Sequence, residues 1–138
     1  MKSALALLLL LAAVAVQAEE KHFTAIKQLT AGGTNAEAYW SPDGTKIIFQ
    51  TTREPYKCDQ IFLMNADGSD QHLVSTGKGR TTCGYFYPDG KHIIYASTHE
   101  AGEQCPPGVD RSKGYFWPVY QSFELYKEIG RASCRERV

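Results

Sequence analysis

The sequence predicts an all-β fold, and three of its features carry this prediction. A segment of eleven residues recurs 46 positions further along the chain, each copy contains a Pro-Asp-Gly turn, and β-branched and aromatic residues flank each turn. Proline presets φ for such a turn, the aspartate side chain can bond its own backbone two residues on, and glycine takes the positive φ. Each copy is therefore expected to form two strands joined by a tight turn.

The first copy, Trp40–Gln50, extends into a unit of four strands. A third apolar segment follows at residues 60–64, a hairpin turn at residues 65–68 and a short fourth segment at residues 72–74. Four short antiparallel strands repeated about every 45 residues are typical of a β-propeller blade. We therefore predict a β-propeller of four-stranded antiparallel blades.

The second copy, Phe86–Ala96, is followed by a long insertion before the next strand. The insertion, Thr98–Gln121, is rich in glycine, proline and charge, and strand character returns at residues 123–126. Ahead of the first copy, residues 26–30 match the fourth-strand pattern and predict a strand that would close the ring against a last blade. We expect a truncated propeller of about two blades, at about residues 31–76 and 77–127.

Several of these segments resemble the Pro-Asp-Gly repeats of the TolB-like propeller family. The resemblance is carried by Ala38–Gly44, Ile61–Gly68 and Pro88–Gly90, and it covers roughly residues 26–97 with a weaker echo at residues 122–127. It implies a rigid propeller platform with variable loops. The family carries an α/β domain ahead of its propeller, whereas here the repeat begins soon after Glu19, so we expect a propeller relative.

The first 18 residues have the features of a secretory signal peptide. Lys2 supplies the positive charge, residues 4–16 are an unbroken apolar run, and Val16-Gln17-Ala18 forms a cleavage site before Glu19. The run of 13 apolar residues is too short to span a membrane. We expect an exported mature chain with no membrane span, in the periplasm or outside the cell.

The last eleven residues, 128–138, match the translation of a common short-read sequencing adapter. They show neither strand alternation nor a turn pattern, so we interpret them as an artefact that interrupts the natural sequence after Lys127. Residues 19–127 contain 11 Lys and Arg against 13 Asp and Glu, a formal charge of −2. This balance gives no basic footprint for nucleic acid.

Blade topology places the Pro-Asp-Gly turns at one end of the blades and the remaining loops at the other. Cys58 and Cys105 fall in loops at the second end, and Cys83 is expected just ahead of the second blade's first strand. An oxidising compartment favours a disulfide among these three cysteines, with the pairing open. Their spacing matches no zinc motif, so no metal site is predicted.

The same end gathers charged and aromatic side chains, and long loops of this kind are often functional. The aromatic run at residues 115–120 suggests a lid or recognition loop, or else a cover for the blade edge. The candidate binding residues are Arg53, Tyr56, Arg80, His99, Asp110, Tyr115 and Trp117.

Other conspicuous residues have structural explanations. Asp43, Asp67 and Asp89 precede turn glycines and are expected to form the turns, while Trp40 and Phe86 are expected to pack between blades. A nucleophile elbow and a phosphate-binding loop are both absent, so we predict neither catalysis nor a cofactor.

Two functions from different classes follow. The first is a secreted or periplasmic, non-enzymatic binding module for a protein, peptide or glycan. The alternative is the N-terminal gating propeller of a prolyl-oligopeptidase-like serine peptidase whose catalytic domain would follow. In either case fewer than three blades would leave apolar faces open, and the fragment is expected to self-associate.

Overall fold

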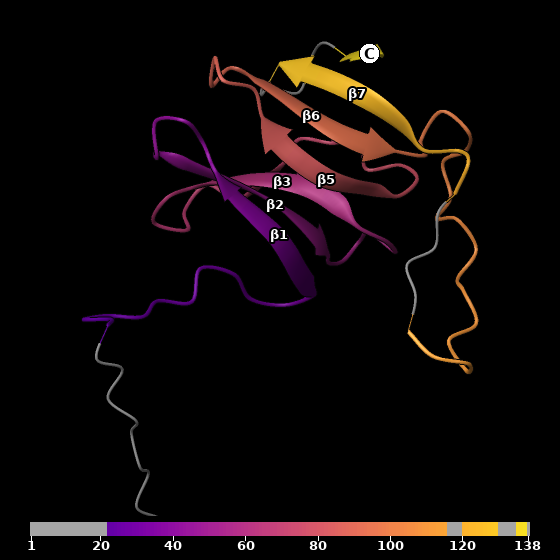
Figure 1. The fold of residues 1–138 in the computed structure, drawn as a ribbon, viewed down its shortest axis with the longest axis horizontal. Coiled ribbons are helices and arrows are strands. Elements are labelled where there is room, and N and C mark those ends of the chain that lie inside the picture. Colours follow the sequence, from indigo (N-terminus) through magenta and orange to yellow (C-terminus); the bar gives the residue numbers. More distant parts are fainter. Residues whose placement is uncertain (1–21, 116–119, 130–134, 138) are drawn as a thin grey trace, which may run out of the picture.

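The computed structural model describes residues 22–115, 120–129 and 135–137, and it folds them into two four-stranded antiparallel sheets (Figure 1). The first sheet has the order β1 (Thr34–Trp40), β2 (Lys46–Thr52), β3 (Gln60–Asn65) and β4 (His72–Leu73). The second has the order β5 (Thr81–Phe86), β6 (His92–Ser97), β7 (Glu124–Ile129) and β8 (Arg135–Arg137). Within these ranges no helix is long and apolar enough to cross a membrane.

Both Pro-Asp-Gly turns form as predicted. The backbone N–H of Gly44 donates to the Ser41 carbonyl at 2.9 Å, and Gly90 repeats this contact with Tyr87 at 2.9 Å. The two glycines have φ of 69° and 64°, in the left-handed region that their missing side chain permits. Asp43 Oδ1 accepts from the Thr45 backbone N–H at 3.1 Å. The aspartate therefore holds the turn.

The main core lies between the two sheets. Ile48 and Ile61 of the first sheet pack in one buried cluster with Ile93, Tyr95 and Tyr126 of the second. All five side chains are almost completely removed from water, which is the dominant stabilising contribution in a fold of this size. Adjacent blades therefore pack face to face.

The opposite face of the first sheet carries a second buried cluster, formed by Ile47, Phe49, Phe62 and Met64. Trp40 pairs with Ile47 on this face, yet 60% of its surface is exposed. The expectation that Trp40 packs between blades is therefore not met, because no sheet of the described chain covers this face. Its counterpart 46 residues later, Phe86, packs against the core between the sheets.

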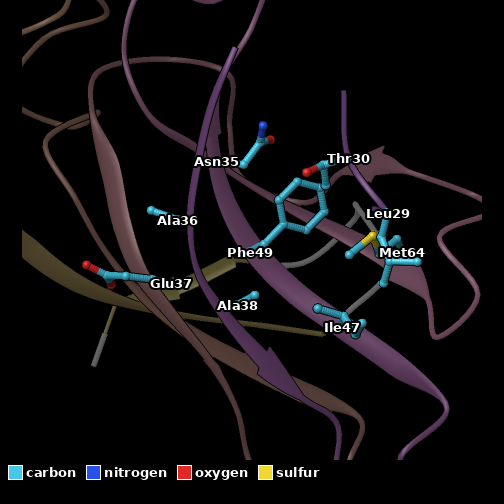
Figure 2. Close-up of a pocket in the computed structure, with 9 residues that line it drawn as sticks. All are labelled: Leu29, Thr30, Asn35, Ala36, Glu37, Ala38, Ile47, Phe49 and Met64. Carbon is cyan, nitrogen blue, oxygen red and sulfur yellow. The ribbon is translucent and has the colours of Figure 1, made fainter. Parts of the chain in front are cut away.

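Residues 26–30 do not form the predicted strand. They run past the open face instead: Leu29 packs against the Phe49 cluster, and its carbonyl accepts from Gln71 Nε2 at 2.8 Å. A hollow of about 280 Å³ remains beside Leu29, bordered by Ile47, Phe49 and Met64 (Figure 2). A strand requires a neighbouring strand that pairs with its backbone, and no strand of the described residues pairs with this segment.

At the other end of the chain, β7 continues through Glu128 and Ile129, and residues 135–137 pair with it as β8. The absence of strand character predicted for residues 128–138 is therefore wrong for these five residues. Glu128 is buried and accepts a hydrogen bond from the Tyr95 hydroxyl. The interpretation of the tail as an artefact stays a prediction, and the predicted signal peptide, residues 1–18, lies outside the described residues.

Candidate functional site

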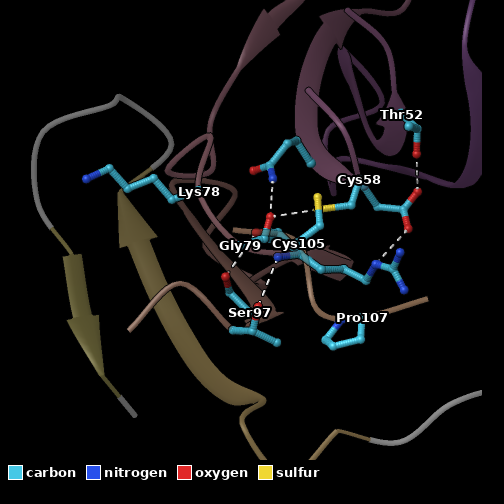
Figure 3. Close-up of a disulfide and its surroundings, with 12 residues drawn as sticks. Thr52, Cys58, Lys78, Gly79, Ser97, Cys105 and Pro107 are labelled. Atoms are coloured by element: carbon cyan, nitrogen blue, oxygen red, sulfur yellow. Dashed lines mark hydrogen bonds and ion pairs between the residues drawn. A yellow bond between two sulfur atoms is a disulfide. The ribbon is translucent and has the colours of Figure 1, made fainter. Parts of the chain in front are cut away.

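A disulfide joins the two blades at the end opposite the Pro-Asp-Gly turns. It links Cys58, in the loop between β2 and β3, to Cys105, with a Cα–Cα distance of 5.9 Å (Figure 3). Cys105 belongs to the segment between β6 and β7, residues 98–123, which we call the β6–β7 segment. The predicted disulfide is thus confirmed, and the structure gives the pairing that the sequence left open.

Hydrogen bonds anchor the first part of the β6–β7 segment beside this disulfide. The Gly79 backbone N–H donates to the Glu103 carbonyl at 2.8 Å, and the Gly79 carbonyl accepts from the buried Gln60 Nε2 at 2.8 Å. Lys78 and Glu103 form an ion pair at the surface. The segment is therefore tied to the first blade covalently and through backbone contacts, and then extends away from the sheets (Figure 1).

The first strand of each blade has a bulge at the same repeat position. The register shifts between Ala36 and Tyr39 in β1 and between Thr82 and Tyr85 in β5. Glu37 and Cys83 occupy these bulges, 46 residues apart, with φ of 49° and 56°. Cys83 thus lies inside β5, which corrects its predicted position ahead of the strand. Bulges re-aim side chains, and they recur next to binding sites.

Gln50, a residue of β2, links the first sheet to the bulge in β5. Its Oε1 accepts from the Thr82 hydroxyl at 2.6 Å and from the Cys83 backbone N–H at 3.2 Å. Cys83 is a free cysteine at the surface, and the partial burial of its thiol raises the pKa, with Glu37 acting in the same direction. The second bulge is therefore held in place by a buried side chain of the first blade.

A pocket of about 440 Å³ opens beside these bulges, and we call it the inner-strand pocket. Strands β1 and β5 form one wall, and the β6–β7 segment contributes another. The lining residues are Thr34, Ala36, Glu37, Gln50, Asp59, Arg80, Thr82, Cys83, Arg111, Tyr120 and Phe123. The pocket combines two arginines, two carboxylates, a thiol and two aromatic rings.

Arg80 and Asp59 form the charged base of this pocket. Arg80 Nε lies 3.7 Å from Asp59 Oδ2, and it is buried without a hydrogen-bond partner among the described residues. Asp59 is better satisfied, because its Oδ1 accepts from the Thr52 hydroxyl at 2.7 Å. The guanidinium of Arg80 therefore keeps unused donor capacity.

Two of the predicted binding residues are already engaged in blade packing. Arg53 donates to Gln71 Oε1 at 3.0 Å, and its guanidinium carbon lies 5.0 Å from the Phe62 ring centroid. Tyr56 packs edge-on against the same ring, with the centroids 6.0 Å apart. Both side chains cover the outer apolar cluster of the first sheet.

The other predicted residues do not converge on one place. His99 is half-buried, with its ring centroid 4.1 Å from that of Tyr126, and Asp110 accepts from the Ser112 backbone N–H at 2.8 Å, which lowers the pKa of Asp110. Tyr115 is 70% exposed, and Trp117 lies outside the described residues. Of the six that the structure describes, only Arg80 lines the inner-strand pocket.

Sequence reasoning missed most of the pocket. Gln50 and Phe123 lie within predicted strands, where residues are expected to be structural. Glu37 lies just ahead of the first repeat copy, and Tyr120 lies near the far end of the long insertion. One pattern could have identified the bulges: Glu37 and Cys83 are separated by the repeat length. Among the described residues, no group of three His, Cys, Asp or Glu side chains is arranged to hold a metal ion.

Comparison with known proteins identifies the fold. No family model and no curated protein matches the chain. A solved structure of a TolB protein from Agrobacterium tumefaciens aligns with a TM-score of 0.57 and 21% identity, over 79% of this chain and 35% of that one. TolB from Acinetobacter baumannii aligns with a TM-score of 0.51 and 17% identity, over 76% of this chain and 21% of that one.

These likenesses define a class of fold, an all-β arrangement of propeller blades. The particular similarity is to TolB structures, at identities that show the fold alone. The chain spans about a third and about a fifth of the lengths of these two proteins. What the inner-strand pocket binds must therefore be argued from its own chemistry.

Proposed function

We propose that this chain is part of an exported, non-enzymatic β-propeller that binds a protein or peptide at the end carrying the disulfide. The observation that supports it best is the inner-strand pocket, which opens between the first strands of two blades and a disulfide-anchored segment. Propellers present binding surfaces on loops that a rigid sheet scaffold positions.

Four features support the proposal. The Cys58–Cys105 disulfide fits an oxidising compartment, and residues 1–18 have the sequence of an export signal. The free thiol of Cys83 has a raised pKa, which disfavours the thiolate that a cysteine nucleophile needs. The β6–β7 segment presents Tyr115 to solvent beside the pocket, and exposed tyrosine is enriched in protein interfaces.

The test is site-specific photo-crosslinking in cells that express the native gene. A photoreactive amino acid at Tyr115 is expected to capture a partner, whereas the same group at Lys91 is expected to capture none. Lys91 is the matched control because it is exposed and follows the Pro-Asp-Gly turn of the second blade. That turn joins β5 to β6, at the end of the second sheet opposite the β6–β7 segment (Figure 1). Equal capture at both positions, or none at Tyr115, would contradict the proposal.

A further inference from the structure

The inner-strand pocket contains two arginines that approach it from different segments. Arg80 lies just before β5, and Arg111 belongs to the β6–β7 segment. A guanidinium offers five N–H donors in a planar fork and can hold a carboxylate through two of them. The pocket can therefore accept a carboxylate if these donors are not already used within the protein.

The Arg80 guanidinium has N–H donors that no described residue uses. Among the described residues its one ion pair is with Asp59, at 3.7 Å between Nε and Oδ2, which is longer than a hydrogen bond. Its buried Nε has no hydrogen-bond partner among the described residues. Since Nε itself is shielded from solvent, an incoming carboxylate would be bound by the terminal N–H groups of the guanidinium.

Arg111 is held in place without using its donors. Its guanidinium carbon lies 5.0 Å from the centroid of the Tyr115 ring. This contact occupies the face of the guanidinium and leaves the N–H groups at its edge available. Arg111 forms no ion pair with any residue that the structure describes.

The remaining walls favour a peptide over a simple anion. Tyr120 and Phe123 supply an apolar side, and the Tyr120 hydroxyl is fixed by donating to the Pro107 carbonyl at 2.7 Å. Glu37 and Asp59 balance the formal charge of the two arginines. A dianionic phosphate would therefore be less well accommodated than one carboxylate with an apolar neighbour.

We propose that the inner-strand pocket binds an extended peptide through one acidic side chain, whose carboxylate is held by Arg80 and Arg111. This inference rests on the proposed function and names the chemistry of the ligand at the same site. The site depends on the β6–β7 segment, which contributes Arg111 and the aromatic wall. Glu37 lies at the Cys83 side of the pocket, and its negative charge would repel a second acidic residue of the peptide there.

The test compares two capped peptides that differ in one group. The probes are acetyl-Ser-Ala-Phe-Asp-Ala-Ser-amide and the same peptide with Asn in place of Asp, titrated against the full chain at low salt. We expect the Asp peptide to bind about tenfold more tightly, as one charge-assisted interaction would produce. Arg80→Gln and Arg111→Gln are each expected to abolish this preference.

Lys113→Gln is the matched control. Lys113 is an exposed cation two residues from Arg111 that does not line the pocket, so its loss removes the same charge from the same segment. The preference for the Asp peptide should survive this substitution. Circular dichroism shows whether each variant is folded. If the variant at half-buried Arg80 unfolds, the variant at exposed Arg111 still tests the site.

Several outcomes would overturn the inference: equal binding of the two peptides, no binding of either, loss of the preference in Lys113→Gln, or displacement of the Asp peptide by inorganic phosphate at matched ionic strength. The crosslinking result separates this inference from the proposed function. If Tyr115 captures a partner while the two peptides bind alike, the carboxylate site is wrong and the binding module stands. If both experiments fail, both proposals are wrong.

Discussion

Asp43 shows how a single side chain makes the first turn sensitive to acid. Its carboxylate accepts hydrogen bonds from the Ser41 hydroxyl and from the backbone and hydroxyl of Thr45, and these lower its pKa from 3.8 to about 2. Because the folded-state pKa is depressed, the ionised carboxylate stabilises the fold fully above the unfolded pKa. That contribution is lost as the pH falls from about 4 towards 2.

We therefore expect Asp43→Asn to reduce the acid sensitivity of folding. Asparagine keeps an acceptor oxygen for the turn but does not titrate, so the loss of stability between about pH 4 and pH 2 should be smaller than in the unsubstituted chain. Urea unfolding at a series of pH values measures this difference. An unchanged dependence on pH would show that the carboxylate charge of Asp43 does not stabilise the turn.

Cys83 gives a second prediction at the scale of one residue. Partial burial of the thiol is the largest cause of its raised pKa, and Glu37 adds to the increase. A hydrogen bond with the Thr82 hydroxyl lowers the pKa in part. Since the thiolate is the reactive form, Glu37→Gln should speed alkylation of Cys83 at neutral pH. Iodoacetamide labelling, quantified by mass spectrometry of the peptide containing residue 83, measures the rate. Glu54→Gln, an exposed carboxylate paired with Lys57, should leave it unchanged.

At the scale of elements, the disulfide is the connection whose loss should cost most. It joins residues 47 positions apart and ties the β6–β7 segment to the first blade. Replacing both Cys58 and Cys105 by serine should lower the free energy of unfolding by about 2–4 kcal/mol. Cys83→Ser is the control, since that thiol is free. Equal urea midpoints for the two variants would contradict a stabilising role for the disulfide.

Gly84 sets how closely β5 approaches the first sheet. A Cβ at this position would lie 2.9 Å from Ile61 Cγ2 and 3.0 Å from Ile48 Cδ1, both in the buried core. Gly84→Val should therefore overpack the contact between blades and cost about 1–3 kcal/mol. Gly102→Val has no atom within 4 Å of the added Cβ and should be nearly neutral in the same unfolding assay. A similar cost for both would mean that the sheets can separate to accept the side chain.

The elements were predictable from the sequence where local chemistry decides them. The turn that contains Asp43 has the residues that its backbone requires. The apolar runs of β2 and β3 form strands whose successive side chains point alternately into the two buried clusters. The site was less predictable because it depends on long-range geometry. Arg53 is a residue type that often binds ligands, but here its guanidinium packs on the Phe62 ring. Arg111 lines the pocket only because the long β6–β7 segment folds back to it, and the sequence does not show that path.

At the scale of the whole molecule, the two sheets leave apolar surface uncovered on both outer sides. Trp40 is 60% exposed on the first sheet, and Leu125 and Ile129 are 50% and 45% exposed on the second. In a ring of blades each such face packs against a neighbouring sheet. We propose that the isolated chain uses these faces to self-associate, since exposed apolar patches of this kind promote association.

Trp40 and Phe86 test this proposal because they occupy the same repeat position in different surroundings. Phe86 packs against the core between the sheets, so Phe86→Ala should destabilise the fold by about 2 kcal/mol or more. Trp40→Ala removes an exposed ring, so it should change stability little and weaken self-association instead. Urea unfolding measures the first effect, and sedimentation velocity over a range of concentrations measures the second. If the unsubstituted chain stays monomeric at every concentration, or if Trp40→Ala costs as much stability as Phe86→Ala, then the outer face of the first blade is not the open contact surface inferred for it.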